Sequence, residues 1–313
     1  MTLAKWLLAL ILAAGIAAVV ARAWRNVGTS GGPWSAALGR LRHDRAGMLA
    51  LRFLIFVAVI AALADWLAPW PNRQIDLIEL ASRPPSVEHP FGTDVYSRDV
   101  LSRLVHGARI SLSVACLAVL VSITVGTSYG AIAGYVGGRV DAVMMRVIDA
   151  LLSIPRILVL LAIFAFWGRV SLGAIVLILG LTGWFATSRL VRAQVLAVKT
   201  EEMVVAARAL GARNRRILWR HILPGVTSIV VVAATLGIGN VIILEAGLSY
   251  LGVGVQPPTA SWGNMISDGS SNIAGLWWMS VFPGLAIVFT VMAFNLVGDA
   301  LRDALDPREI QAA

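Results

Sequence analysis

The chain has 313 residues, of which 58% are hydrophobic and only 14% charged, and its mean hydropathy is +0.81. Soluble domains carry about 25% charged residues, so this composition excludes a soluble protein and indicates a chain that lies mostly in a bilayer. The 26 basic residues outnumber the 17 acidic ones, which in a membrane protein indicates positive cytoplasmic loops beside anionic lipids rather than nucleic acid binding.

Several apolar runs are long enough to cross a membrane as helices, for which about 20 residues are needed. They cover residues 3–21, 49–70, 109–134, 143–167, 172–190, 226–250 and 276–298. The runs are apolar on all sides instead of alternating with polar residues, which favours helices over strands. The sequence therefore predicts an all-α polytopic membrane protein.

The charges of the loops predict the orientation of these helices. Residues 21–50 hold five arginines against one aspartate, and residues 189–221 hold eight basic residues against two glutamates. Residues 71–108 hold four arginines against five acids, and residues 251–275 hold only Asp268. An even number of runs separates the two basic segments, so both are predicted to be cytoplasmic and the other two external.

The first run, 3–21, has three interpretations. Lys5 before the apolar stretch and a small-residue triplet after it are also typical of a cleavable signal peptide. Cleavage would leave the arginine-rich residues 24–50 outside, against the charge rule, so we expect an uncleaved span with its N-terminus outside. A helix lying on the membrane surface is the third interpretation.

Within the third run, Gly126, Gly130 and Gly134 recur every four residues. This spacing places a flat stripe on one helix face, where a neighbouring backbone can approach closely. We interpret it as helix packing.

The segment 189–225 is too long and polar for a simple turn, and such segments are usually functional. Thr200 followed by two glutamates favours a helix start, and Gly211 favours its end. A second short amphipathic helix is expected to stop at Pro224. The product is a cytoplasmic helix-turn-helix that could enter a groove on a partner.

This segment resembles the coupling loop of ABC importer permeases, in which two alanines, a glycine four residues on and a later Leu-Pro recur. The resemblance implies docking into a cleft on a cytoplasmic ATPase subunit. Val205 and His221 depart from the glutamate and isoleucine that are usual there. The residues expected at the ATPase are Glu202, Ala206, Ala207, Arg208, Gly211, His221, Leu223 and Pro224.

Other motifs are similar to those of dipeptide and oligopeptide permeases, and the resemblance covers about residues 48–308. The motifs lie at 89–103, 148–155, 245–252, 256–263 and 298–307. The resemblance implies the MetI-like transmembrane fold of type I ABC importers, with six family helices and one additional N-terminal helix. The expected divisions are an N-terminal helix and basic linker (1–47), a first family helix and external segment (48–108), a core with the coupling loop (109–298) and a cytoplasmic tail (299–313).

Three residues inside the spans are candidates for the translocation path or its gate. Glu245 lies near the external end of its run, where a carboxylate is costly unless it meets water or a partner; it either contacts the path or braces two helices. Asp149 is expected to pair locally with Arg146, and Pro155 to bend its helix at a gate.

The external segments 71–108 and 251–275 are either ordinary capping loops or a docking surface for a substrate-binding protein. The family resemblance favours docking. The residues expected to contribute are Gln256, Pro257, Pro258 and Trp262.

Motifs for catalysis are absent from the sequence. It contains no phosphate-binding Gly-x-x-x-x-Gly-Lys-Ser/Thr, no His-Glu-x-x-His and no Gly-x-Ser-x-Gly, and one cysteine cannot form a cysteine metal cluster. We therefore expect a non-catalytic subunit without a cofactor, whose partner ATPases use ATP and Mg²⁺.

The resemblance to dipeptide and oligopeptide permeases implies that the chain forms half of the translocation pathway of an ATP-driven peptide importer in the bacterial inner membrane. By the same resemblance, the expected partners are a homologous second permease, two ATPase subunits and an extracytoplasmic binding protein. Membrane lipids are a further expected partner, and nucleic acid is not. An importer of nickel, metal chelates or glutathione is the alternative with the same architecture. An ion-coupled secondary transporter is the alternative of another class, but it predicts inverted repeats and mid-membrane ionisable residues.

Overall fold

The computed structural model describes residues 39–70, 80–168, 170–270 and 273–305. Over these residues the secondary structure consists of helices joined by turns and loops, with one isolated bridge between Thr93 and Asp99. The helices are α3 (Arg45–Ala62), α4 (Ala64–Leu67), α5 (Val100–Val136), α6 (Gly138–Leu152), α7 (Arg156–Trp167), α8 (Leu172–Val198), α9 (Glu202–Ala209), α10 (Asn214–Ile217), α11 (Leu223–Tyr250), α12 (Trp262–Ser270) and α13 (Trp277–Leu305). The predicted first span, 3–21, lies outside the described residues.

The prediction of an all-α membrane protein is confirmed. In the described part of the chain, five helices are long and apolar enough to cross a membrane, or six if α6 and α7 form one broken span. That pair corresponds to the predicted run 143–167, and its two halves are bent by 72° at a break that contains Pro155. The six family helices expected after the N-terminal run are thus all found.

The helices extend beyond the predicted apolar runs. Helix α5 begins at Val100 because the Asp99 carboxylate accepts the Ser102 backbone N–H and caps it. Helix α13 continues to Leu305, so the first residues of the predicted tail, from residue 299, are still helical, and the last turns of this helix pack against Leu41. Hydropathy detects the stretch that contacts lipid, whereas hydrogen bonding and packing carry the helices into the aqueous layers.

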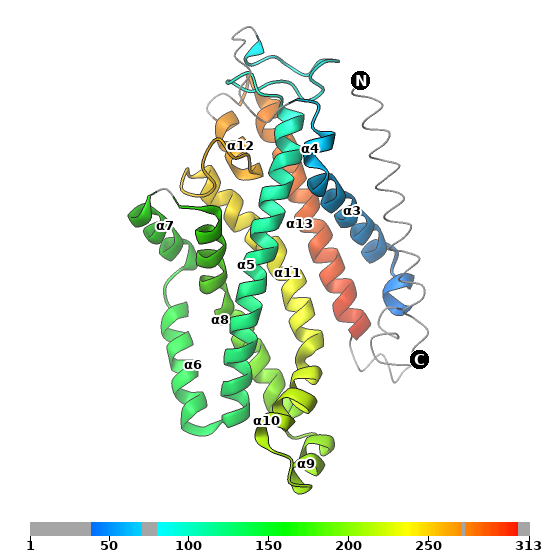
Figure 1. Cartoon of the computed structure of the whole chain (residues 1–313), viewed down its shortest axis with the longest axis vertical. Helices are drawn as coiled ribbons and strands as arrows, with labels where there is room; N and C mark the ends of the chain where they lie inside the picture. Colours follow the sequence, from blue (N-terminus) through cyan, green and yellow to red (C-terminus); the bar gives the residue numbers. More distant parts are fainter. Residues whose placement is uncertain (1–38, 71–79, 169, 271–272, 306–313) are drawn as a thin grey trace.

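The glycine stripe of α5 packs directly against α8, as predicted. A Cβ atom at Gly126 would lie 2.8 Å from the Trp184 carbonyl, and one at Gly134 would lie 2.9 Å from the Arg192 carbonyl. Figure 1 shows the two helices side by side at the centre of the bundle. Their close approach therefore requires residues without side chains.

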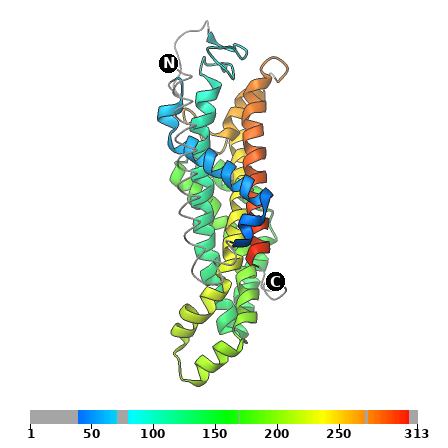
Figure 2. The ribbon, with the colours of Figure 1, turned by 90° about the vertical axis from the view of Figure 1, so that its right-hand side faces the viewer.

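The loops between the long helices lie at the two ends of the elongated bundle (Figures 1 and 2). Helices α9 and α10 project beyond the bundle at one end, whereas α12 and the segment before α5 lie at the other. The alternation of helix directions thus places both weakly charged loops opposite the basic segment 189–221, as the charge pattern predicts.

Candidate functional site

Helix α9 of the basic segment ends in a glycine cap. Gly211 has φ +78°, and its N–H donates to the Arg208 carbonyl while the Ala212 N–H donates to the Ala207 carbonyl. These two bonds form a Schellman motif, which needs a residue that tolerates a left-handed backbone. A Cβ at Gly211 would meet no atom within 4 Å, so the requirement for glycine here is conformational and not steric.

The start of α9 differs from the prediction. Glu201, and not Thr200, is the residue before the helix, and no side chain caps it. The Thr200 hydroxyl instead donates to the Ala197 carbonyl at 2.8 Å, at the end of α8. Lys199 and Thr200 therefore belong to the C-terminal turn of α8, and the Thr200 side chain is bonded there instead of capping α9.

One face of α9 anchors the segment and the other is open. Val204 is fully buried, whereas Met203, Val205, Ala206 and Leu210 are exposed. The buried cluster beneath joins Val204, Ile217 and Ile222 to Ala131, Val191, Val195, Val198 and Val226. The segment is therefore fixed to α5 and α8 while a thin apolar face, with small Ala206 at its centre, remains free. Glu202 and Arg208 are also exposed, and Ala207 is half-buried.

Pro224 does not stop the second helix, contrary to the prediction. Residues 214–250 form one continuous helical span, in which Leu218–Ile222 is a π-helical turn and Pro224 lies near the start of α11. In this turn the Leu223 N–H donates to the Leu218 carbonyl, five residues earlier. Proline lacks an N–H and clashes with the carbonyl four residues before it, and a π turn relieves that conflict without ending the helix. His221 is half-buried within the turn.

Polar contacts tie the segment to the ends of the bundle helices. The Tyr135 hydroxyl donates to Asn214 at 2.8 Å, and the Lys199 ammonium donates to the Gly134 carbonyl at 2.9 Å. Arg192 of α8 binds Asp141 of α6, with Nη2 2.6 Å from Oδ2. Displacement of the segment is thus mechanically connected to α5, α6, α8 and α11.

Asp149 pairs across the bundle and not along its own helix. Its carboxylate accepts from Arg189 of α8, and the predicted local pair with Arg146 is wrong. Helix α6 runs beside α8, so a complementary charge on the neighbour was available that one-helix spacing could not reveal. Pro155 lies at the break between α6 and α7, which confirms the predicted bend; a gating role stays a prediction.

The Glu245 side chain is 1% exposed and sits in a serine network. The Ser111 hydroxyl of α5 donates to Oε2 at 3.1 Å, and the Ser249 hydroxyl donates to Oε1 at 2.7 Å. Ser249 accepts in turn from the Val255 N–H at 2.9 Å, and Ser111 from the Trp262 N–H at 3.3 Å. These bonds favour the second interpretation of Glu245, a hydrogen bond that braces two helices, because they join α5 and α11 to the loop before α12.

Trp262 is the one predicted docking residue whose position contradicts that role. Its indole is 2% exposed, and Nε1 donates to the Leu104 carbonyl at 3.1 Å. A large aromatic in an interhelical position gains more by burial than by exposure, so Trp262 belongs to the core. Gln256 and Pro257 are accessible at the loop, where the Gln256 amide donates to the Gly252 carbonyl at 2.7 Å.

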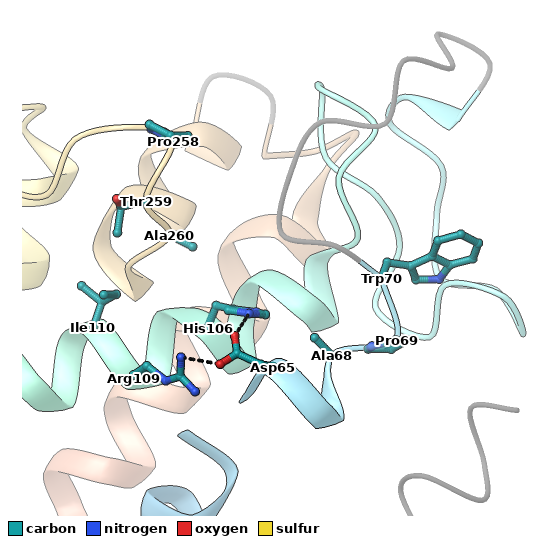
Figure 3. A pocket seen from close by; sticks show the side chains of 10 residues that line it. All are labelled: Asp65, Ala68, Pro69, Trp70, His106, Arg109, Ile110, Pro258, Thr259 and Ala260. Carbon is teal, nitrogen blue, oxygen red and sulfur yellow. Dashed lines mark hydrogen bonds and ion pairs between the residues drawn. The ribbon is translucent and has the colours of Figure 1, made fainter. Parts of the chain in front are cut away.

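Pro258 lines an external cavity of about 690 Å³ (Figure 3). Across from it, Arg109 Nη1 lies 2.9 Å from Asp65 Oδ2, and His106 Nε2 lies 3.3 Å from Asp65 Oδ1. The hydrogen bond and charge of Arg109 are the main cause that lowers the pKa of the Asp65 carboxyl below its ordinary value. The cavity thus pairs a fixed charge cluster with the predicted docking loop.

A buried charge cluster at the external end was not anticipated. Arg103 Nη1 lies 2.6 Å from Asp94 and 2.9 Å from Asp268, and Arg98 contacts the same two carboxylates at 2.6 and 3.1 Å. The cluster clamps the segment before α5 onto α12. Its sequence signal was the pair of arginines at the start of α5, Arg98 just before the helix and Arg103 in its first turn. Their partner Asp268 lies 165 residues after Arg103.

Comparisons with known proteins all find membrane components of binding-protein-dependent transport systems. Residues 126–311 match the family described as "Binding-protein-dependent transport system inner membrane component", and residues 32–85 match the "N-terminal TM domain of oligopeptide transport permease C". The chain is 42% identical to the dipeptide transport system permease protein of Bacillus subtilis, over 86% of this chain and 84% of that protein. It is 37% identical to the oligopeptide transport system permease protein of Haemophilus influenzae, over 88% and 89% of the two chains. It is also 40% identical to the glutathione transport system permease protein of Escherichia coli, over 88% and 91%.

Proposed function

Because the chain belongs to the family of binding-protein-dependent transport system inner membrane components, we propose that it forms half of the pathway of a peptide importer. It is a non-catalytic, multi-pass inner-membrane permease of an ABC importer, and its family carries no cofactor of its own. That assignment replaces the alternative of an ion-coupled secondary transporter. The second half of the pathway is a homologous permease subunit.

The coupling role of residues 189–225 is supported chiefly by the continuity of this segment with a span. Helix α9 offers its free alanine face beyond the bundle, and residues 214–250 run without a break into the membrane. An ATPase subunit that grips α9 would move α5, α8 and residues 214–250 through the buried cluster around Val204. The unbroken helix 214–250 would carry this motion into the membrane. ATP binding closes two such ATPases, and this motion opens the pathway to the outside.

Cargo is proposed to be di- or oligopeptides, delivered by an extracytoplasmic binding protein that docks near Gln256, Pro257 and Pro258. Dipeptide, oligopeptide and glutathione permeases are similar to this chain at nearly equal identity. Glutathione is itself a tripeptide, so it is the nearest alternative. Uptake of labelled dipeptide and glutathione by proteoliposomes containing the full transporter, each competed by the other, distinguishes the two.

The coupling assignment is tested by blocking the alanine face. Ala206 is exposed in the described structure, so Ala206→Trp should leave the subunit folded. Loss of a tightly packed contact worth about 2 kcal/mol would weaken ATPase binding roughly thirtyfold, measured by co-purification and cargo-stimulated ATP hydrolysis. Ala142→Trp, at another exposed alanine on α6, is the matched control. Wild-type assembly and hydrolysis in the Ala206 variant would exclude this face as the docking site.

A further inference from the structure

A guanidinium lies inside the membrane beside the broken span. Arg156 opens α7, directly after the 72° bend, and reaches across to α8. Its Nη2 donates to the Leu179 carbonyl at 2.7 Å and its Nε to the Thr182 hydroxyl at 3.3 Å. These residues lie seven and ten positions into α8, or about 10 to 15 Å below its external end at 1.5 Å per residue. That depth is near the middle of a hydrocarbon layer about 30 Å thick.

Arg156 has no acidic partner among the described residues, in contrast to three other arginines of the long helices. Arg109, Arg189 and Arg192 each pair with an aspartate. A guanidinium carries five N–H donors, and the two contacts on α8 use only two of them. A charge at this depth is costly unless it meets water or a ligand, so the remaining donors point to a polar occupant.

Next to the guanidinium is a cavity of about 250 Å³ between α5, α7, α8 and α11. Its polar lining residues besides Arg156 are Ser122, Thr187 and Asn240. Gly183 leaves room beside the guanidinium, because a Cβ there would lie 3.0 Å from Arg156 Nη2 and 3.2 Å from the Ser122 hydroxyl. Asn240 is exposed at the surface of the chain, so the cavity is open to the surface at this residue.

We propose that Arg156 binds a carboxylate of the cargo as it crosses the membrane, an inference that rests on the proposed function. A carboxylate accepts two parallel N–H bonds from one guanidinium, and such charge-assisted pairs are the strongest hydrogen bonds in proteins. The cavity is smaller than a drug-sized pocket, so it fits one end of a peptide and not the whole molecule. Ser122 and Asn240 supply further hydrogen-bonding groups for that end. The site selects cargo with a free carboxylate, such as the C-terminus of a peptide.

The test measures transport of the dipeptide Ala-Ala per ATP hydrolysed, with the complete transporter in proteoliposomes. Arg156→Gln removes the charge and should lower this ratio about tenfold or more, the effect of one lost charged hydrogen bond. Arg156→Lys keeps the charge and should lose less. Arg146→Gln, at an exposed arginine of the same broken span, should retain the wild-type ratio. An unchanged ratio in Arg156→Gln overturns the proposal.

Two further outcomes separate the alternatives. A wild-type complex that binds its ATPases but transports neither Ala-Ala nor a longer peptide would refute the peptide function and this site with it. If Arg156→Gln fails to assemble, the wild-type complex is treated with the arginine reagent phenylglyoxal. Ala-Ala should slow modification of Arg156, detected by mass spectrometry, and Ala-Ala amide should not. Equal modification with both peptides would mean that Arg156 does not bind the carboxylate.

Discussion

Replacing Gly130 by alanine should separate α5 from α8. A Cβ at this position would overlap the Ser188 carbonyl oxygen and lie 3.0 Å from both the Arg192 nitrogen and the Val191 Cβ. A carbon normally approaches such an oxygen to about 3.3 Å or more. Two of the three obstacles are backbone atoms, which cannot rotate away, so the helices themselves must move.

The magnitude follows from two opposing effects. Overpacking costs up to about 3 kcal/mol, whereas exchanging a helical glycine for alanine returns about 1 kcal/mol through helix propensity. The net loss is about 2 kcal/mol, equivalent to a fall of roughly 3 °C in the melting temperature of a chain of this length, at about 2.1 cal/mol/K of unfolding entropy per residue. The strain falls at the cytoplasmic half of the pair, close to the Lys199–Gly134 contact.

The assay is thermal denaturation of the purified subunit in detergent, followed by circular dichroism. Gly173→Ala on α8 is the matched control, because a Cβ there meets no atom within 4 Å. The control should melt at or slightly above the wild-type temperature. If Gly130→Ala melts together with Gly173→Ala, the close approach of α5 and α8 is not required for stability, and the packing argument fails.

Four further outcomes are expected. Gly211→Val should weaken ATPase co-purification by straining a left-handed position by about 1 to 2 kcal/mol; Gly211→Asn should retain more binding, and equal losses would contradict the cap. Asp94→Asn should cost about 3 to 5 kcal/mol by leaving two buried arginines short of a carboxylate, and a variant with wild-type behaviour in size-exclusion chromatography would argue against the clamp. Glu245→Gln should melt and transport nearly as the wild type, since the amide oxygen can accept from one serine and the amide N–H can donate to the hydroxyl oxygen of the other. Lost transport with unchanged melting would instead favour a role in the path. Arg109 lowers the pKa of Asp65 in the folded protein below 3.8, so the ion pair should persist from pH 5 to 8 and be lost only as the pH falls through that lowered pKa. An infrared titration of isotope-labelled carboxylates that places the pKa of Asp65 above 3.8 would refute the pairing.

Short sequence patterns predicted helix contacts and helix ends correctly where a single physical effect decides the structure. The glycines of α5 indicated a close helix contact because their spacing alone defines a face, and Gly211 indicated a helix end because few residues tolerate its backbone. The same kind of short pattern gave a wrong prediction at Pro224, where the second helix was expected to stop. The usual effect of a proline is to end a helix, but a π turn in the preceding residues absorbed the conflict.

Pairings between distant residues could not be predicted in this way. Asp149 had a plausible partner one turn away in Arg146, yet it binds Arg189, which lies 40 residues further on. Trp262 was expected to be an accessible aromatic residue of a docking loop, yet it packs under the external end of α5. Arg156 lies within the predicted apolar run 143–167, and its neighbours on α8 are not visible from that run. In each case the deciding neighbour lies on another helix.

The sequence by itself determined that this chain is a helical membrane protein, which loops share a side and which segment resembles an ATPase-coupling loop. Those conclusions depend on hydrophobicity, charge and short-range backbone preferences, which act within a turn or along one span. Only the tertiary structure decided that the coupling segment continues into α11, that Glu245 is held by serines and that Arg156 has no acidic partner within the described chain. Such facts depend on which helix faces pack together, because a buried charge is defined by the groups that surround it in space.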